Sequence, residues 1–384
     1  MTPEITFFPV GNGDMTLIRL SSGRTILIDT NIRQVCDGVR DVLKDLRERL
    51  RTDDEGRPYV DVMILSHPDQ DHCRGFEAHF HIGPLTDYPT KGEPSKIVIR
   101  EMWSSPLVFR RASKNHTLCD DAKAWNREAK RRVALFKEEG LGEDGDRILI
   151  LGEDTGGKTD QLGEILVKTD ATITRVAGHA EEKFSALLLA PMNADDEVDA
   201  DKLSKNESSV IMNFSIGTGA VSDAVKFLTG GDAEVYIWEK QWKRHESKAE
   251  NLTYDLLLSP HHCSWHTLSY DSWSEKKEDA KVSADARKAL AQARAGAYIV
   301  ASSCPILDDD NDPPCIRAKR EYDSIANGVK GQFINTSTHP SEKAPEPMTF
   351  EITSGGVKAK WKSSAVPRTA TASSVLASTP LSHG

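Results

Sequence analysis

Short apolar runs separated by tight turns open this chain and predict β-strands. The first three runs cover residues 4–10, 15–20 and 25–29, and the turns between them are rich in glycine, asparagine and serine. Such turns are typical of strands that pair in sequence order. A continuous apolar run at 60–65 then predicts a strand that is buried on both faces.

Apolar residues at helical spacing predict helices after these strands, and the second half of the chain repeats the pattern. Helices are predicted at residues 34–50, 73–80, 120–139, 234–250 and 284–295. Further strands are predicted at residues 96–102, 147–151, 172–176, 185–190, 208–216, 224–229, 254–259, 297–302, 348–353 and 357–361. Two halves of this kind favour a strand-rich sandwich with helices outside.

The domain organisation follows from the absence of a long linker. We expect residues 1–361 to form one continuous domain with an acidic loop insertion at 195–205. The segment 362–384 is rich in serine, threonine and alanine, which predicts a disordered tail.

Composition adds a location and excludes one class of function. Of the 384 residues, 38% are hydrophobic and 28% charged, and no apolar run reaches the length of about 18 residues that a membrane span needs. No secretory signal is visible at the start, and six scattered cysteines without a CxxC pair fit a reducing cytoplasm. We therefore expect a cytoplasmic protein without membrane association. The net charge of −10 argues against a protein that coats nucleic acid through its overall field, but not against an enzyme with local cations.

The segment after the strand at 60–65 carries the strongest chemical signal. Ser66-His67-Pro68-Asp69-Gln70-Asp71-His72 gathers two imidazoles and two carboxylates, which together suit Zn, Mn or Fe in an open site. Any single one of these residues has an ordinary alternative role in a turn or at a helix N-terminus. The whole string after a buried strand favours a cation site.

Two later strands end in similar chemistry. Asp232 follows one apolar strand, and the pair His261-His262 follows another. Strand ends on one edge of a sheet converge, and catalytic residues commonly lie there. Asp14 and Asp29, each at a turn or strand end, either stabilise turns or support the metal ligands from behind.

Six segments, taken in chain order, resemble the metallo-β-lactamase fold and are most similar to the hydrolase domain of the DNA-uptake competence proteins. They are Val10-Gly11-Asn12-Gly13-Asp14, Leu27-Ile28-Asp29-Thr30, Ser66-His67-Pro68-Asp69-Gln70-Asp71-His72, Asn206-Glu207-Ser208-Ser209-Val210, Leu228-Thr229-Gly230-Gly231-Asp232 and Pro260-His261-His262-Cys263-Ser264. The resemblance covers residues from about 4 to 361. It implies an α/β (α+β) fold, a four-layer αββα sandwich with a metal site at one edge of the two sheets.

The resemblance also implies where a first metal ion would bind. His67 and Asp69 would hold it, with Asp69 standing where most relatives have a histidine, and Asp232 would bridge to a second ion. The third histidine that many relatives supply has no clear match, and His179 is a candidate for it. A carboxylate-rich first site favours Mn over Zn.

For the second metal ion, the resemblance implies Asp71, His72 and one histidine of the His261-His262 pair. His262 is preferred, because Ser264 follows it with the usual spacing of the family. One or two divalent ions, Zn or Mn, are therefore expected as cofactors.

The implied activity is metal-dependent hydrolysis, most often of phosphodiesters in DNA or RNA, so the expected partner is a nucleic acid or nucleotide. Asp71 and Asp232 are the expected catalytic residues, and Asp71 would orient the nucleophile and help to protonate the leaving group. His266, after the ligand pair, either contacts substrate or is a hydrogen-bonded structural histidine.

Local basic clusters offer a grip on a nucleic-acid backbone, with two tryptophans interleaved for stacking on bases. They are Arg110-Arg111 with Lys114, Lys130-Arg131-Arg132, and the run 240–248 with Trp238 and Trp242. The other interpretation is that these charges form solvated helix faces and that both tryptophans pack against the sandwich.

Two alternatives to a nuclease remain open. One is a hydrolase of a small molecule such as a lactam, lactone or thioester, which a closed apolar pocket would favour. The other is a metal-poor scaffold that binds a protein partner. The missing third histidine of the first metal site keeps the scaffold open. The chain also departs from the family elsewhere: Arg74-Gly75 replaces Gly-Gly, Cys263 replaces a glycine, and Asp312-Pro313-Pro314 stands where a His-Pro element is usual.

Overall fold

The computed structural model describes residues 1–36, 39–89, 95–106, 118–153, 157–192 and 208–361. Three sequence predictions lie outside the described residues: the acidic insertion at 195–205, the tail at 362–384, and the basic cluster around Arg110, Arg111 and Lys114.

The first β-sheet joins both ends of the described chain. Its strands run in the order β20-β19-β1-β2-β3-β6-β7-β8-β9, with β5 paired to β6. They are β1 (Glu4–Phe7), β2 (Thr16–Arg19), β3 (Thr25–Ile28), β5 (Arg51–Thr52), β6 (Pro58–Leu65), β7 (Val98–Ser104), β8 (Arg147–Leu151), β9 (Leu166–Val167), β19 (Met348–Thr353) and β20 (Gly356–Ala359). Strands β3, β6, β7, β8 and β9 are parallel. Their carboxyl ends therefore meet at one edge.

The second sheet has seven strands in the order β10-β13-β14-β15-β16-β17-β18. They are β10 (Thr172–Ile173), β13 (Phe184–Ala190), β14 (Ile211–Thr218), β15 (Val221–Thr229), β16 (Tyr254–Leu258), β17 (Ala293–Ala301) and β18 (Gln332–Asn335). Strands β15 to β18 are parallel, so this sheet also collects carboxyl ends at one edge. A separate hairpin pairs β11 (Arg175–Val176) with β12 (His179–Ala180).

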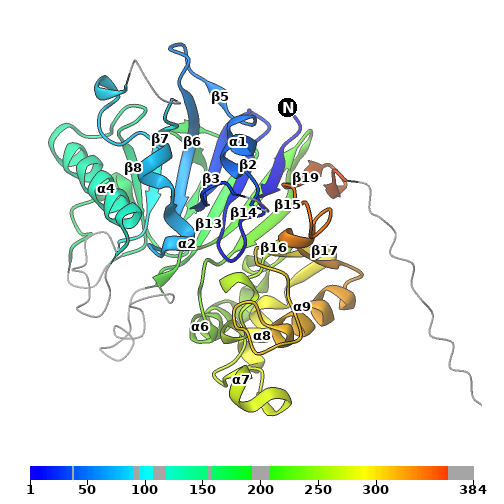
Figure 1. Cartoon of the computed structure of the whole chain (residues 1–384). Helices are drawn as coiled ribbons and strands as arrows, with labels where there is room; N and C mark the ends of the chain where they lie inside the picture. Colours follow the sequence, from blue (N-terminus) through cyan, green and yellow to red (C-terminus); the bar gives the residue numbers. More distant parts are fainter. Residues whose placement is uncertain (37–38, 90–94, 107–117, 154–156, 193–207, 362–384) are drawn as a thin grey trace, which may run out of the picture.

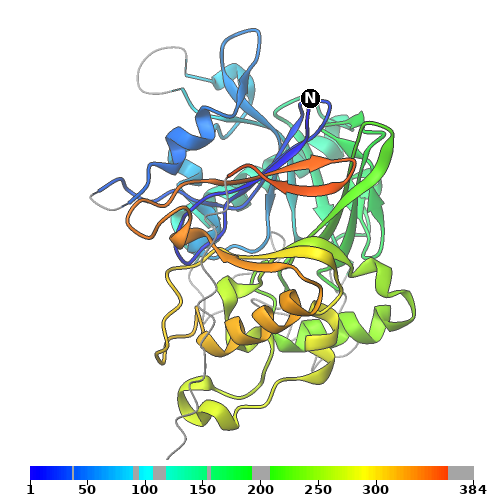
Figure 2. The same cartoon turned by 90° about the vertical axis from the view of Figure 1, so that its right-hand side faces the viewer.

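Helices cover the outer face of each sheet (Figures 1 and 2). On the first sheet these are α1 (Val42–Arg47), α2 (Gln70–Cys73), α3 (Phe76–His79) and α4 (Asp120–Glu139). On the second sheet they are α6 (Val235–His245), α7 (Trp273–Lys276), α8 (Ala284–Leu290) and α9 (Ile316–Gly328).

Three apolar layers hold these four layers of secondary structure together. Between the sheets, the rings of Phe7 and Phe227 meet edge to face with centroids 5.6 Å apart. Met63 of β6 packs outward with Trp125 of α4, and Trp238 of α6 is fully buried against the second sheet. The predicted αββα sandwich is thus confirmed, and its alternation follows from strands with apolar residues on both faces.

Two predicted helices are shorter than expected. The helix expected at 34–50 is only α1, because Asp41 caps it by accepting from the Lys44 N–H. Val35, counted on its apolar face, is instead 57% exposed. The helix expected at 73–80 divides into α2 and α3, because the extended backbone of Arg74 lets its carbonyl accept from the Ile32 N–H at 3.0 Å.

The prediction at 284–295 joined the end of α8 to the start of β17, and α9 and β18 were missed. The apolar stripe of α9 was present in the sequence as Ala318, Tyr322, Ile325 and Ala326, which are buried at helical spacing. Charged residues between them obscured it.

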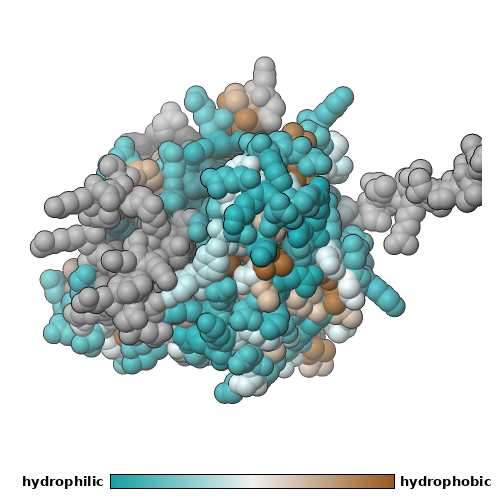
Figure 3. Space-filling view, turned by 90° about the horizontal axis from the view of Figure 1, so that it is seen from below, coloured by the Kyte–Doolittle hydropathy of each residue, from teal (hydrophilic) through white to brown (hydrophobic). Residues whose placement is uncertain are grey.

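The surface is mostly hydrophilic when the sandwich is seen from below, with hydrophobic residues in small separate patches (Figure 3). Within the described ranges, every helix is too short or too polar to cross a bilayer.

Candidate metal centre

The sequence-predicted ligands follow the carboxyl ends of strands in both sheets. The segment 66–72 follows β6 in the first sheet. Asp232 follows β15, and the turn His261–Cys263 follows β16, in the second sheet. The two edges are joined where the Val210 N–H donates to the Ser66 carbonyl at 2.9 Å. Residues far apart in the chain thus reach one place.

The two carboxylate oxygens of Asp232 each face a pair of imidazole nitrogens. Oδ1 lies 3.1 Å from Nε2 of His72 and 3.5 Å from Nε2 of His262. Oδ2 lies 3.5 Å from Nε2 of His67 and 3.7 Å from Nε2 of His261. The cluster therefore divides into an Oδ1 half and an Oδ2 half that share one buried carboxylate.

A further carboxylate lies beside each half. In the Oδ1 half, Asp71 Oδ2 lies 3.3 Å from His262 Nε2. In the Oδ2 half, Asp69 Oδ2 lies 3.7 Å from His67 Nε2, and the Asp69 side chain is 62% exposed. Each half offers two imidazoles, one outer carboxylate and one oxygen of Asp232, a donor set that suits Zn or Mn.

Hydrogen bonds behind the ring of His72 fix which nitrogen faces Asp232. Nδ1 of His72 lies 2.8 Å from Asp29 Oδ2, which also accepts from Ser66 Oγ at 2.6 Å. A carboxylate at Nδ1 favours the tautomer that is protonated there. The Nε2 lone pair is then directed into the cluster.

The ring of His262 has two groups behind it that select opposite tautomers. Its Nδ1 lies 3.2 Å from the Ser302 carbonyl and 3.1 Å from the Gly13 N–H. A ring nitrogen either donates or accepts, so the bond to Ser302 forms in the tautomer that frees Nε2.

Asp14 has an oxygen within 4.8 Å of the other ligand atoms. Its short contacts, 3.5 Å to His262 and 4.0 Å to His72, are to Nδ1 atoms, so Asp14 supports both rings from behind.

The turn that carries the histidine pair has an unusual backbone. His261, His262 and Cys263 have φ values of 50°, 52° and 69°, and left-handed residues other than glycine cost about 1–2 kcal/mol each. The His261 N–H donates to the Gly231 carbonyl at 3.0 Å, which helps to hold the turn. Strain of this kind is typical of functional sites. Here it sends consecutive imidazoles to different oxygens of Asp232.

Gly231 is required by close packing as well as by its φ of 48°. A Cβ at this position would lie 3.0 Å from Ser66 Cβ and 3.1 Å from Ser209 Cβ. The chain can therefore bring Asp232 between the two sheet edges only where no side chain intervenes.

The carboxylates and imidazoles of the cluster stabilise one another in their charged forms. Burial is the largest effect on Asp232 and opposes its ionisation, yet the nearby His72 and His262 imidazoles hold the pKa of this carboxyl well below its usual range. Burial likewise opposes charge on His72 and His262, but Asp232 raises the pKa of both rings well above the usual value. The pKa of Asp71 is also lowered, because the imidazoles of His262 and His72 outweigh the effect of burial. Protons thus occupy the imidazoles of the Oδ1 half when no other cation is there.

Two buried atoms at the centre, His67 Nε2 and Asp232 Oδ1, have no hydrogen-bond partner. Buried polar atoms are nearly always satisfied in folded proteins. The imidazole nitrogens and carboxylate oxygens all face one centre, and a divalent cation that displaces the protons would satisfy them together.

The structure places His179 away from this cluster, so it cannot supply the missing ligand. His179 lies in β12, close to Glu181, whose side chain pairs with Arg24 at 2.6 Å. Arg24 precedes β3, whereas the cluster lies beyond the end of that strand. The interpretation of His179 as the third ligand is wrong. The imidazole at that place is His261, which sequence reasoning held only as an alternative to His262.

Ser264 and His266 contact Asp312 rather than the centre of the cluster. Ser264 Oγ donates to Asp312 Oδ1 at 2.6 Å, and His266 Nε2 lies 3.8 Å from Asp312 Oδ2. The hydrogen bond gives Ser264 a structural role, whereas the exposed His266 lies beyond hydrogen-bond distance and its role stays a prediction. The sequence placed Asp312 only where the family has a His-Pro element, and no spacing linked it to Ser264.

The basic clusters within the described residues mostly serve the fold. Arg131 pairs with Glu128 and Asp146, each at 2.7 Å, and Arg132 is fully buried beside Glu128. Trp238 is fully buried and cannot stack on a base. The nucleic-acid interpretation of Arg131, Arg132 and Trp238 is therefore wrong, because these side chains complete the packing of α4 and α6. For the exposed Lys130 it stays a prediction.

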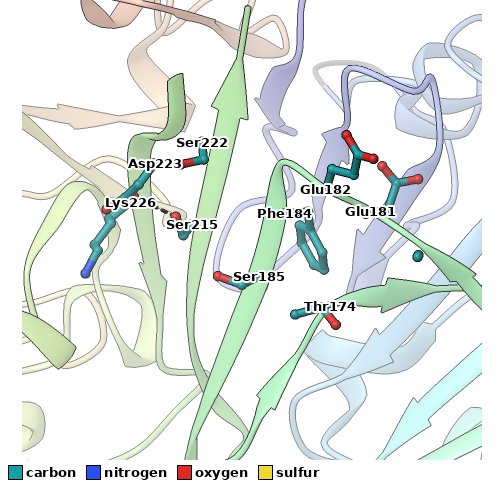
Figure 4. Close-up of a pocket in the computed structure, with 10 residues that line it drawn as sticks. Thr174, Glu181, Glu182, Phe184, Ser185, Ser215, Ser222, Asp223 and Lys226 are labelled. Atoms are coloured by element: carbon teal, nitrogen blue, oxygen red, sulfur yellow. Dashed lines mark hydrogen bonds between the residues drawn. The ribbon is translucent and has the colours of Figure 1, made fainter. Parts of the chain in front are cut away.

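One pocket of about 630 Å³ lies at the other end of the second sheet (Figure 4). Polar side chains line it, among them Ser215, which donates to Asp223 at 2.6 Å, and Lys226. Asp223 precedes Asp232 by nine residues along β15 and its following turn, a span of up to about 30 Å at 3.3 Å per residue. This pocket is separate from the candidate metal centre.

No protein-family model and no curated protein sequence matches this chain. Among solved structures, a mutant of the CmlA beta-hydroxylase is similar with a TM-score of 0.35 and 12% identity over 91% of this chain. A long-form RNase Z from yeast is similar with a TM-score of 0.34 and 10% identity over 82% of this chain. The chain spans 54% of the length of the hydroxylase and 40% of that of the RNase Z.

Proposed function

We propose that this chain is a metal-dependent hydrolase of the metallo-β-lactamase fold that binds two divalent ions, Zn or Mn, one in each half of the cluster around Asp232. The observation that carries the proposal is the pairing of each Asp232 oxygen with two imidazole Nε2 atoms. His67, His261 and Asp69 would hold one ion, and His72, His262 and Asp71 the other.

The donor set fits this assignment. A single carboxylate between two groups of imidazoles is a geometry suited to two neighbouring ions, which lie about 3.5–4 Å apart in two-metal enzymes. Asp29 and Asp14 stand behind His72 and His262, as supporting carboxylates commonly do in metal sites. The His261 contact removes the main reason for considering a metal-poor scaffold.

The reaction we propose is hydrolysis of a phosphodiester in a nucleic acid or nucleotide. Divalent ions bound here would supply a water acidified to a pKa of roughly 7 and positive charge for the attacked phosphoryl group. Asp71 is about one-third exposed, so it can accept a hydrogen bond from the attacking water and hold it in line. Ordered carboxylates and imidazoles around the reacting atoms need little reorganisation during the reaction. The resemblance of the sequence motifs to those of the competence-protein hydrolase supports this substrate class. We include a cytoplasmic location and a further protein partner in the proposal.

The experiment is a panel of metals against substrates. The purified full chain is assayed with Zn, Mn and Mg on single-stranded DNA, duplex DNA, RNA and cyclic nucleotides, and on a lactam as the small-molecule probe. Bound metal is counted by elemental analysis. We expect up to two ions per chain and hydrolysis of a phosphodiester that chelation abolishes. Metal near zero, unchanged after addition of Mn or Zn, would contradict the proposal.

A further inference from the structure

Arg33 and Arg74 are the two arginines in the described ranges whose side chains have no hydrogen-bond or ion-pair partner. The others pair with carboxylates or backbone carbonyls, as Arg127 does with Glu77 at 2.7 Å and Arg175 with the Gly178 carbonyl. Both Arg33 and Arg74 are half-buried. An acidic chain with 59 carboxylates against 49 lysines and arginines leaves these two guanidinium groups without an anion.

Arg33 is nevertheless held in place. Its Nη1, Cζ and Nη2 atoms lie 3.2, 3.4 and 3.5 Å from the position that a Cβ would take on Gly11. Three nearly equal distances mean that the flat face of the guanidinium rests on Gly11. A Cβ there would press on the guanidinium, and the φ of 75° at Gly11 favours glycine. The N–H groups, which lie in the plane of the guanidinium, are left available at its rim.

Both arginines adjoin the candidate metal centre. Bridges pair Thr30 with Cys73 and Asn31 with Arg74, so the chain before Arg33 runs beside the end of α2. The loop under Arg33 also touches the ligand segment, because the Asp14 N–H donates to the Asp71 carbonyl at 3.2 Å. The backbone segments that carry the two arginines therefore border the ligand segment that contains Asp71.

We propose that Arg33 and Arg74 bind a phosphate that neighbours the scissile one, so the substrate is a strand with several phosphates. The inference rests on the proposed function. A guanidinium presents planar N–H pairs that match two oxygens of a phosphate. The ions would take the reacting phosphate, and the arginines the next one along the strand.

The test compares a substrate that has a neighbouring phosphate with one that lacks it. Arg33→Ala and Arg74→Ala are assayed with Mn on a short oligothymidylate and on bis-p-nitrophenyl phosphate. Loss of a charge-assisted hydrogen bond predicts a rise in KM for the oligothymidylate of about tenfold or more for each variant. Hydrolysis of bis-p-nitrophenyl phosphate should not change. Arg33→Lys should recover only part of the loss, and Arg127→Ala, which removes a paired arginine on α4, is the matched control.

A second readout does not depend on catalysis. Binding of labelled oligothymidylate to the full chain in EDTA is measured by fluorescence anisotropy. We expect the affinity of Arg33→Ala to be about tenfold lower than that of the wild type, and to decrease less steeply as the salt concentration rises. Wild-type protein that hydrolyses diesters while both variants keep full oligothymidylate affinity would overturn the arginine site and leave the proposed function intact. Arginine-dependent binding without hydrolysis by any metal would support the site and overturn the proposed function. Wild-type protein that does not bind oligothymidylate would overturn the site.

Discussion

The Oδ2 atom of Asp29 lies 2.8 Å from Nδ1 of His72, and both side chains are fully buried. Asp29 adopts a left-handed φ of 57° directly after β3, which brings its carboxylate behind the ring. A residue that follows one strand thus orients an imidazole that follows another. The arrangement makes the metal affinity of the Oδ1 half depend on a residue that would not itself touch an ion.

Asp29→Asn should lower the affinity for Mn or Zn by about 10–100-fold, because the neutral amide no longer favours the Nδ1-protonated ring. Competition titration with a metal indicator measures the change, and circular dichroism checks the fold. Asp45→Asn, which alters a carboxylate paired with Arg40 on α1, serves as control. Equal affinity in Asp29→Asn and wild type would remove the supporting role of Asp29.

His261→Ala should reduce the metal content by one ion per chain, because it empties one position of the Oδ2 half. His179→Ala is the matched control, since His179 is exposed and lies in β12. Elemental analysis after gel filtration gives the stoichiometry. Unchanged content in His261→Ala together with loss in His179→Ala would reverse the assignment.

The double variant Asp71→Ala with His72→Ala should abolish hydrolysis of bis-p-nitrophenyl phosphate, because it removes two donors of the Oδ1 half. Urea unfolding of the variant should remain cooperative, since α2 is short and makes a small part of the core. Full activity in a folded double variant would show that the ligand segment is misassigned.

The stabilisation that His72, His262 and Asp232 give the metal-free protein should be complete between about pH 3.8 and 6.5. The pKa values of His72 and His262 are raised above the usual 6.5, so their stabilisation is complete below that pH and is lost as pH rises through the folded values. The pKa of Asp232 is lowered below 3.8, so its stabilisation is complete above that pH and is lost on further acidification. Thermal unfolding in EDTA across this range measures the curve. A metal-free Tm that climbs steadily from pH 6.5 to 8.5 would contradict it.

Glu128→Gln should lower the free energy of unfolding by about 3–5 kcal/mol, because it breaks a buried ion pair and leaves Arg132 without its carboxylate. Arg132 is fully buried and lies 2.8 Å from Glu128. The exposed pair of Glu77 with Arg127 gives the control, since Glu77→Gln should change stability by less than about 1 kcal/mol. Denaturant unfolding compares the two variants, and equal losses would contradict a structural role for Glu128.

The sequence predicted an element correctly where its apolar spacing was regular. It was less accurate where capping or a hydrogen bond to a distant segment sets the end of the element. Asp120–Glu139 forms the helix that its spacing predicts, because its apolar stripe lies within the segment and its caps, Cys119 and Gly140, directly flank it. Val35 has helical spacing too, but the capping of α1 at Asp41 leaves it outside the helix. Spacing within a segment cannot report a hydrogen bond to a distant carbonyl such as that of Arg74.

The candidate site shows the same division. The ligand types were readable as motifs after buried strands, and the structure brings His67, His72, Asp232 and His262 together. Which imidazole faces which oxygen of Asp232 depends on the left-handed turn at His261–Cys263, and no pattern in the sequence predicts that turn. The unpaired state of Arg33 and Arg74 is likewise visible only from the partners of the other arginines in the described residues.

Asp232 comes from one sheet, whereas His67 and His72 come from the other, so any ion bound between them would cross-link the two halves of the sandwich. Binding energy would then add directly to folding energy by mass action, at about 2.7 kcal/mol when the free ion exceeds its Kd a hundredfold. The concentration of free metal would in that way set the folded fraction of this protein as well as its rate of hydrolysis.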